Sequence, residues 1–177
     1  MRYISWRRKR SSDASIAGTT ALIQQALHDT YSFNKRRFQR IEEQVETYSH
    51  EIEHSPETFS LYRQRLEDKG IQVQMLRDFI RSMQKGIEVS GKAERLASEA
   101  AIEYTYTLMF LAIAELFKFG RERLQTLQKR IKLYTWCIRD GDVMVPEFMK
   151  CMAIECGQVH TNIDDWERVH GELRIYG

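Results

Sequence analysis

Two apolar stripes of identical spacing constrain the fold of this chain more than any other feature. In each stripe, apolar residues recur at intervals of 3, 4, 3 and 4. The first stripe is Phe38, Ile41, Val45, Tyr48 and Ile52, and the second is Leu124, Leu127, Ile131, Tyr134 and Ile138. Such spacing places the side chains on one face of an α-helix that can be buried. With only 9 Gly and 2 Pro in 177 residues, the chain lacks the turns of an all-β fold. We therefore predict an all-α helical bundle.

Residues that start and stop helices predict the other elements of the bundle. Ser12 and Asp13 suit the N-cap of a first helix that ends near residue 32, and Gly70 and Gly157 suit helix ends. The expected helices span about 13–32, 35–53, 56–69, 73–85, 92–118, a segment that contains the stripe 124–138, then 146–156 and 162–170. The most apolar run, Tyr106–Ala114, predicts the most buried helix. It is too short to cross a bilayer, which needs about 20 apolar residues.

The two stripes lie 86 residues apart, and the residues that flank them are also similar when aligned at this offset. From the pair 21/107 to the pair 52/138, 7 of 32 aligned residues are identical. After small gaps, Pro56-Glu57 recurs as Pro146-Glu147. Unrelated amphipathic helices share stripe positions but rarely share such breaks, so we predict two degenerate copies of a roughly four-helix unit. The predicted units are 13–89 and 92–177, with Ser90-Gly91 between them and a basic N-terminal arm at 1–12.

The same corner follows the first helix of each predicted copy. Phe33-Asn34 aligns with Phe119-Gly120, and Asn and Gly are the residues that most readily adopt a positive φ. We therefore predict a left-handed residue at Asn34 and Gly120 that ends one helix and begins the next. The alternative is a single helix that tolerates Asn or Gly. Arg37 and Arg123, one turn later, are expected to bind the open carbonyl groups of the preceding helix rather than a ligand.

The charged residues around the two stripes have opposite signs. The first helix of the pair carries Glu42, Glu43 and Glu46, and residues 41–57 include no Lys or Arg. The aligned helix and its start carry the basic residues Lys118, Arg121, Lys129, Arg130 and Lys132. Three interpretations are open: two solvated faces, pairing of the copies with each other or across a homodimer, or docking of the basic helix on phosphates or on an acidic groove of a partner.

One enzyme motif is present in the sequence. His50-Glu51-Ile52-Glu53-His54 reads H-E-x-x-H, in which two histidines one helical turn apart can bind zinc and the glutamate can activate a zinc-bound water. However, Glu53 is charged where zinc-protease helices carry an uncharged residue, Pro56 ends the helix, and the aligned segment 136–140 contains no histidine. A metallohydrolase at His50 and His54 is therefore a remote alternative. We expect no catalytic residues, no metal and no other cofactor.

The N-terminus and the cysteines give two weaker expectations. The arm carries Arg7, Arg8, Lys9 and Arg10 beside Trp6, which suits either a solubilising tail or contact with nucleic acid. No apolar segment follows these residues, so they do not form a signal peptide. The net charge is only +2, which gives no global field that would attract nucleic acid. The three cysteines form no C-x-x-C pair, and we expect reduced thiols in a cytoplasmic protein.

The segment Leu108–Leu124 resembles part of a group of small helical proteins encoded by phages and prophages of Firmicutes. The resemblance lies in an apolar helix followed by Phe117-Lys118-Phe119-Gly120-Arg121-Glu122-Arg123-Leu124, with a fainter copy at Tyr31–Phe38. It implies an accessory protein in the cytoplasm of the host cell. Such proteins often act by binding and inhibiting, and some are anti-CRISPR or other counter-defence factors. No functional residue is carried over from the group.

These observations together predict a non-enzymatic protein that binds and inhibits a host macromolecule, such as a CRISPR-type nuclease. The expected partner is a host protein or ribonucleoprotein, with nucleic acid as a further partner and with no membrane. The basic and acidic helices are the predicted docking surfaces. The alternative is a DNA-binding regulatory or phage-assembly protein that uses the arm and the basic helix.

Overall fold

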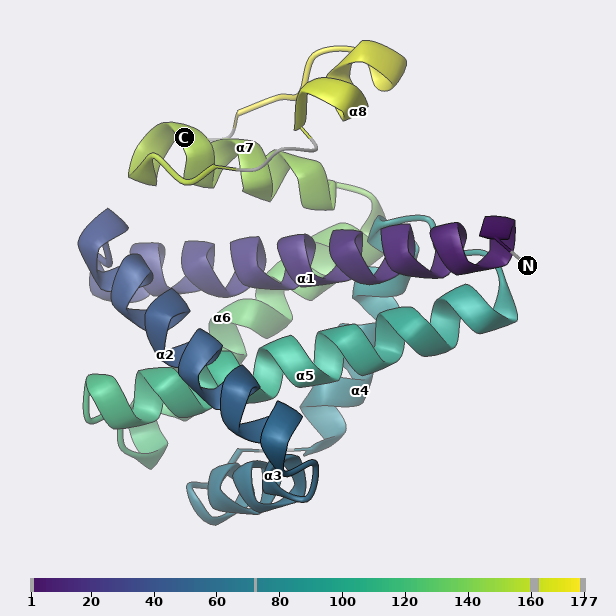
Figure 1. Cartoon of the computed structure of the whole chain (residues 1–177). Coiled ribbons are helices and arrows are strands. Elements are labelled where there is room, and N and C mark those ends of the chain that lie inside the picture. The colour runs from purple at the N-terminus through teal and green to yellow at the C-terminus, as the bar shows by residue number, and fades with distance from the viewer. Residues whose placement is uncertain (1, 72, 160–162, 176–177) are drawn as a thin grey trace.

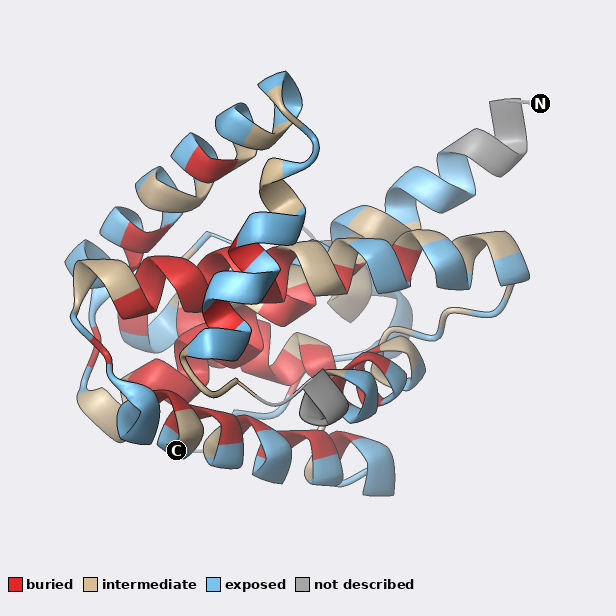
Figure 2. Cartoon of the chain, turned by 90° about the horizontal axis from the view of Figure 1, so that it is seen from below, coloured by how far each residue is buried: buried red, intermediate tan, exposed pale blue. Residues whose placement is uncertain are grey.

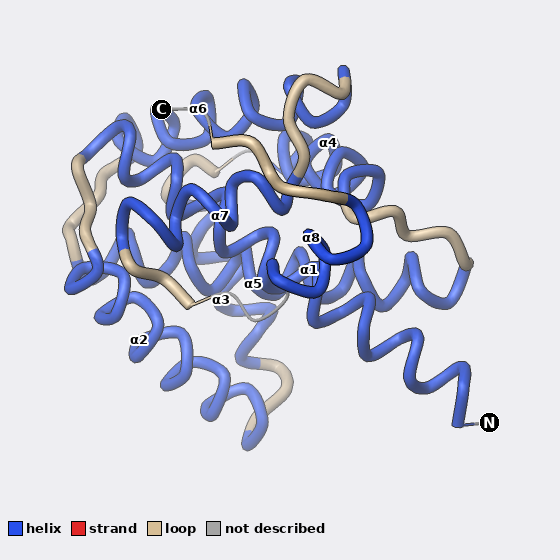
Figure 3. Tube along the Cα trace, turned by 90° about the horizontal axis from the view of Figure 1, so that it is seen from above, coloured by secondary structure: helices blue, strands red, loops and turns tan. Residues whose placement is uncertain are grey.

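The computed structural model describes residues 2–71, 73–159 and 163–175, which form a bundle of helices without strands (Figures 1 and 3). The predicted all-α class is confirmed. In chain order the helices are α1 (Arg2–Tyr31), α2 (Lys35–His54), α3 (Thr58–Asp68), α4 (Val73–Gly86), α5 (Lys92–Leu116), α6 (Arg121–Asp140), α7 (Val145–Cys156) and α8 (Ile163–His170). Residue 162, where the last helix was expected to begin, lies outside the described residues. None of the described helices combines the length and apolar character needed to cross a membrane.

Helices α1 and α5 lie side by side and run in the same direction through the middle of the molecule (Figure 1). Near the middle of α1 and in the first half of α5, the Ser15 hydroxyl donates to the Ser98 hydroxyl at 2.7 Å. At their C-terminal ends, the rings of Tyr31 and Phe119 have centroids 4.8 Å apart. Residues 21–27 of α1 and 105–114 of α5 are all buried, as the apolar sequence of α5 predicts. A helix that is buried on every side needs neighbours on every side, so this pair is the core on which the other helices pack.

The other helices cover the central pair from different sides. α2 and α3 pack on α5, whereas α6 and α7 pack on α1. α4 lies against both α5 and α6, and α8 packs on α7 at the edge of the molecule (Figure 1). The predicted stripes face inward, with Val45 and Ile52 partly buried and the other eight residues buried. Figure 2 shows the same division on the outer helices, which bury one side and expose the other.

The start of α1 corrects the sequence prediction. α1 begins at Arg2, well before the N-cap that Ser12 and Asp13 suggested. That prediction was wrong because Ser12 contributes to the packing of α1 on α5 instead of capping the start of a helix. The hydroxyls of Ser11 and Ser12 donate to the carbonyl oxygens of Glu94 and Ala97, at 3.2 and 3.5 Å. The basic segment is therefore the first part of α1, and its residues 6–10 are exposed.

The corner after α1 and α5 has the predicted break, but the left-handed residue lies elsewhere. The residues with positive φ are Ser32 (φ 53°) and Lys118 (φ 55°), not Asn34 and Gly120. Asn34 and Gly120 are the N-caps of α2 and α6 and have extended backbone. The side chain of Asn34 accepts a hydrogen bond from the backbone N–H of Arg37 at 3.3 Å. The prediction was wrong at these two positions because an N-cap needs extended rather than left-handed backbone.

The two corner arginines contact the elements that precede them. As predicted, Arg37 donates from Nη1 to the carbonyl oxygen of Tyr31, at 3.4 Å, and so satisfies an open group at the end of α1. Its guanidinium also lies 5.1 Å from the ring centroid of Phe33. The guanidinium of Arg123 has the corresponding position, 5.5 Å from the ring of Phe119. Both arginines therefore contribute to the corner as packing residues.

The first residue of α7 is enclosed between two glycines of other helices. A Cβ atom added to Gly18 of α1 would stand 2.7 Å from Cγ1 of Val145, and one added to Gly86 of α4 would stand 2.7 Å from Cγ2 of Val145. Contacts below 3.0 Å force atoms to move, and the branched Val145 side chain has little freedom to do so. Glycine at both positions thus lets α1, α4 and α7 meet closely.

We predict that Gly18→Ala lowers the free energy of unfolding by about 1 to 2 kcal/mol, because the clash with Val145 outweighs the better helix propensity of alanine. Urea denaturation measures the change. Val145→Ala removes the clashing methyl groups, so the double variant should lose about 1 kcal/mol less than the sum of the single variants.

The matched control for this prediction is Gly120→Ala. No atom lies within 4 Å of the position that its Cβ would occupy, so we expect a change below about 1 kcal/mol. Strict additivity of the Gly18 and Val145 variants would contradict the close approach of the three helices.

Candidate functional site

The strongest candidate surface is the exposed side of α6, where two of the predicted basic residues lie. Lys129 and Lys132 are exposed and lie on the opposite side of α6 from its buried stripe. Lys118 lies before α6 begins, at the left-handed position of the corner. The structure therefore brings Lys129 and Lys132 together and separates them from Lys118.

The other two predicted basic residues of this helix contact the protein itself. Arg121 lies over Gly70, where an added Cβ atom would come within 2.6 Å of its Nε. Arg130 is half-buried and near enough to Tyr134 to act on its hydroxyl electrostatically. Arg121 is exposed at the start of α6, apart from the two lysines, and the half-buried Arg130 contributes less to the exposed surface than the sequence pattern suggested.

Three further side chains extend the surface formed by Lys129 and Lys132. Leu133 and Trp136 are 46% and 49% exposed. The Nζ atom of Lys132 lies 5.4 Å from the ring centroid of Trp136, within cation–π distance. Arg139 follows one turn after these residues and is also exposed. We call these five residues, Lys129, Lys132, Leu133, Trp136 and Arg139, the α6 outer face.

The charge pattern of the sequence did not identify Leu133, Trp136 and Arg139 as surface residues. The signal that could have found them is their spacing, because positions 129, 132, 133, 136 and 139 form a second helical stripe opposite the buried one. The α6 outer face offers a large aromatic ring and an aliphatic side chain between three positive charges. Such a surface can bind an acidic partner and bury apolar area at the same time.

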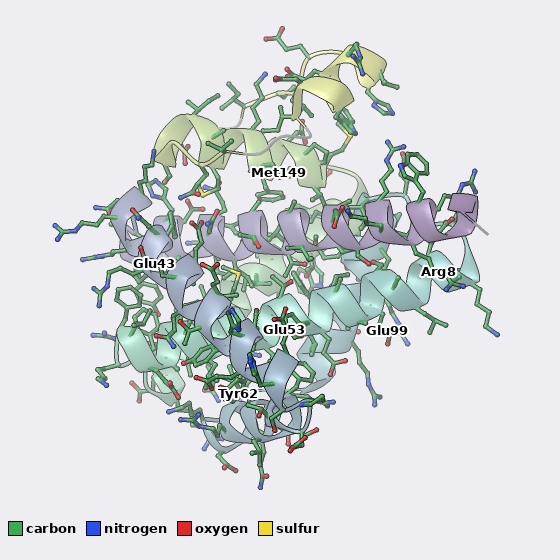
Figure 4. The ribbon with its side chains drawn as sticks, viewed as in Figure 1. Arg8, Glu43, Glu53, Tyr62, Glu99 and Met149 are labelled. Carbon is green, nitrogen blue, oxygen red and sulfur yellow. The ribbon has the colours of Figure 1, made fainter. Side chains whose placement is uncertain are left out.

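The predicted acidic residues of α2 are all exposed, but they differ in their contacts. Glu43 and Glu46 are exposed on the outer side of α2, and Figure 4 labels Glu43 and Glu53 along this helix. Glu42 instead accepts a hydrogen bond from Nε2 of Gln24 in α1, at 3.1 Å. Loss of hydration at this contact raises the pKa of Glu42. Glu42 therefore links α2 to α1, whereas Glu43 and Glu46 lie on the outer side of α2.

The basic residues at the start of α1 form a separate surface. Arg7, Arg8, Lys9 and Arg10 are all exposed. Arg7 lies 3.8 Å from the carboxylate of Glu94 at the start of α5, and the guanidinium of Arg10 lies 5.5 Å from the ring of Trp6. Since α6 contacts α1 at its other end, through Asp29, the structure does not merge these residues with the α6 outer face.

The H-E-x-x-H residues lie at the exposed end of α2. The rings of His50 and His54 are stacked with centroids 5.5 Å apart, and Nδ1 of His54 lies 2.7 Å from the carbonyl oxygen of His50. The carboxylate of Glu51 accepts a hydrogen bond from the hydroxyl of Tyr62 in α3. Among the described residues, no group of three His, Cys, Asp or Glu side chains could hold a metal ion. Glu51 thus connects α2 with α3.

A cysteine and a histidine that are far apart in the sequence meet between α1 and α7. The Sγ atom of Cys156 lies 3.4 Å from Nδ1 of His28, and Nε2 of His28 lies 3.6 Å from Glu155. Nδ1 of His28 is also 2.7 Å from the carbonyl oxygen of Phe33, so this nitrogen carries the proton and donates it to that oxygen. Burial raises the pKa of the Cys156 thiol. The pair therefore holds a protonated thiol, which is a poor nucleophile.

Three tyrosines link the outer helices to carboxylates of their neighbours. The hydroxyl of Tyr48 in α2 donates to Glu115 of α5 at 2.6 Å, and the hydroxyl of Tyr134 in α6 donates to Asp29 of α1. Burial, followed by the hydrogen bond to a carboxylate, raises the pKa of both hydroxyls strongly. The same causes raise the pKa of Tyr62, bonded to Glu51, to about 12. The folded state therefore stabilises the protonated form of each tyrosine.

We predict that the free energy of unfolding falls as the pH rises from 10 towards 12. In this range the unfolded chain ionises its tyrosines at the ordinary pKa of about 10, while the folded chain keeps Tyr48, Tyr62 and Tyr134 protonated. The double variant Tyr48→Phe/Tyr134→Phe should be less stable at pH 7 by about 1 kcal/mol for each lost hydrogen bond. Urea denaturation between pH 8 and 11 compares the two proteins. Their stabilities should converge with rising pH, and parallel curves would contradict the prediction.

Comparisons with protein-family models, with curated proteins and with solved structures found no match. The resemblance to helical phage proteins therefore stays a prediction. The case for a function depends on the surfaces of this molecule, above all on the α6 outer face.

Proposed function

We propose that the chain is an internal duplication in which 13–89 and 92–177 are the two copies. Helices α2 and α6 support this, since both have 20 residues and their bounds differ by the offset of 86 found in the sequence. The left-handed residues Ser32 and Lys118 have the same offset.

Contacts between the proposed copies occur in reciprocal pairs, which also supports duplication. The rings of Phe33 and Phe117 have centroids 4.8 Å apart, and so do the rings of Phe119 and Tyr31. Each pair becomes the other when 86 is added to one residue number and subtracted from the other. The bonds of Tyr48 and Tyr134 to the opposite copy follow the same rule. This exchange is expected for two copies related by a twofold rotation. The correspondence weakens at α4 and α8, which pack on different helices.

We further propose that the protein is a non-enzymatic accessory protein of phage type that inhibits a host macromolecule by binding it. The observation that supports this proposal is the α6 outer face. Tryptophan is enriched among the residues that contribute most to protein–protein affinity, and surrounding charges select the partner. A surface that combines Trp136 and Leu133 with three cations fits an acidic groove on a protein better than a uniform array of phosphates. A CRISPR-type nuclease is the target class that we propose.

We predict that the wild-type chain, added in a near-equimolar amount, blocks DNA cleavage by at least one member of a panel of purified, guide-loaded CRISPR-type nucleases. Lys129→Glu/Lys132→Glu should raise the concentration needed for half-inhibition about tenfold or more, because like charges then face each other in the complex. Cleavage of a labelled DNA duplex measures both.

The control for this experiment reverses the aligned residues of α2. Glu43→Lys/Glu46→Lys changes the same number of charges on the same helix length, and inhibition should persist. Circular dichroism verifies that both variants are folded. Equal loss of inhibition in the two variants, or no inhibition of any nuclease by the wild-type chain, would contradict the proposal.

The second candidate function, DNA binding, is favoured by the start of α1. Four consecutive basic residues are exposed there beside Trp6, on a helix rather than on a flexible tail. Helices with exposed basic residues can contact the phosphates of a duplex.

If this candidate is correct, the chain retards a DNA duplex in a gel-shift experiment, and the affinity falls steeply with salt, with a log–log slope of about −0.9 for each phosphate contacted. Arg8→Glu/Lys9→Glu should abolish the shift, whereas Lys129→Glu/Lys132→Glu should only weaken it. Absence of retardation by the wild-type chain at low ionic strength would exclude this function.

A further inference from the structure

The exposed sides of α2 and α6 carry opposite charges at four aligned positions. On α2 these residues are Arg36, Glu43, Glu46 and Glu53, and on α6 they are Glu122, Lys129, Lys132 and Arg139. Each α6 residue follows its α2 counterpart by 86 positions, and all eight side chains are exposed. The sign is inverted at every one of the four positions. The inversion therefore recurs from the first turn to the last turn of the two helices, and it includes one pair, Arg36 and Glu122, in which α2 is the basic member. Lys35 and Arg121, at the same offset, are both basic.

The spacing of these charges places them on a continuous stripe. The four positions are separated by 7, 3 and 7 residues, which keeps their side chains on one side of a helix. Between the charges, Thr47 and His50 of α2 align with Leu133 and Trp136 of α6. Two helices of 20 residues that meet along such stripes can stay in contact over about 30 Å.

We propose that the exposed side of α2 in one copy of this chain docks on the α6 outer face and Glu122 of a second copy, with the two helices parallel. In this register each of the four charges faces an opposite charge. Glu43 of one copy faces Lys129 of the second, and Glu46 faces Lys132. The ring of Trp136 lies opposite His50, so its exposed surface is covered by another aromatic ring.

The same charges disfavour the other ways of pairing these helices. An antiparallel pair can still place Glu43 and Glu46 opposite the two lysines of α6. It would then place Arg36 opposite Arg139 and Glu53 opposite Glu122. Contact of α2 with α2 would place Glu43 opposite another glutamate. Contact of α6 with α6 would place Lys129 opposite another lysine. Since like charges in contact are unfavourable, only the parallel pair of α2 with α6 matches all four positions.

Both stripes are exposed in a single molecule and are therefore available for this contact. α2 packs on α5 and α3, and α6 packs on α1 and α4, in each case with the opposite side of the helix. Within the described part of the chain, Arg36, Glu46 and Lys129 form no ion pair, whereas Glu53 lies 4.0 Å from His50 and Arg139 lies 3.0 Å from Asp140 of its own helix. Each molecule has one stripe of each kind, so every molecule can bind a second one through α2 and another through α6, which generates chains or rings, or can use both stripes on one partner in a twofold dimer.

The inference does not rest on the proposed inhibitory function, because it concerns the purified chain alone. The experiment is sedimentation of the full chain over a range of concentrations, at low and at high ionic strength. We expect concentration-dependent association at low salt that weakens strongly near 0.5 M salt, where exposed charges are screened. A monomer at every concentration under low salt would overturn the proposal.

Two charge-reversed variants test the faces. Glu43→Lys/Glu46→Lys and Lys129→Glu/Lys132→Glu should each weaken association at least about tenfold, and an equimolar mixture of the two should restore it because complementary faces then meet. The control Asp68→Lys/Glu99→Lys gives the chain the same net charge as the first variant through exposed residues of α3 and α5, and it should associate like the wild type. Failure of the mixture to associate, or equal weakening by the control, would overturn the proposal.

A single substitution tests the register. In the parallel pair, Arg36→Glu places a like charge opposite Glu122 and weakens association, and the further change Glu122→Arg restores it. In an antiparallel pair, Arg36→Glu would relieve repulsion with Arg139 and strengthen association. Circular dichroism verifies folding of each variant, and strengthening by Arg36→Glu would rule out the parallel arrangement.

Discussion

The parallel packing of α1 on α5 is the constraint on which the rest of the structure depends. Each of these helices has a stretch that is buried on every side, so neither is stable in water without neighbours all round. α2 and α3 supply the cover for α5, and α6 and α7 supply it for α1. Each outer helix needs only one apolar stripe for this purpose. The opposite side of each is therefore free of packing demands, which explains why α2 and α6 can have similar stripes and opposite charges.

The sequence predicts the parts of this fold that depend on local pattern. The alternating intervals of 3 and 4 predicted the buried sides of α2 and α6, and Gly70 and Gly157 end helices as their φ values of 85° and 62° require. The start of α1 depended on contacts with α5. The hydroxyls of Ser11 and Ser12 have the local character of a cap, and only the position of α5 shows that they donate to its carbonyl groups.

The candidate surface was predictable in part for the same reason. Charge alone identified Lys129 and Lys132, but it also grouped them with Arg121, whose side chain lies over Gly70, and with Arg130, which is half-buried. Whether a long basic side chain extends into solvent or lies on its own protein depends on neighbours that are distant in sequence. Trp136 shows the opposite case, because an aromatic residue in a helix is usually assigned to the core and here it is half-exposed. The pairing of Cys156 with His28 likewise has no local signal.

The reciprocal contacts and the inverted charges have a common physical basis. In the duplication that we propose, a twofold rotation places the two copies in equivalent surroundings, so their interiors must satisfy the same packing requirements. The 4.8 Å ring pairs of Phe33 with Phe117 and of Phe119 with Tyr31 illustrate that shared requirement. Their surfaces have no such requirement within the molecule. If the outer sides of α2 and α6 had the same charge, they would repel each other when two molecules meet. Because their charges are opposite, the outer side of α2 in one molecule is complementary to that of α6 in another. Change at the outer positions of α2 and α6 can therefore create such a contact without any change in the core, because the stripe that folds each helix and the stripe that meets a second molecule share no residue.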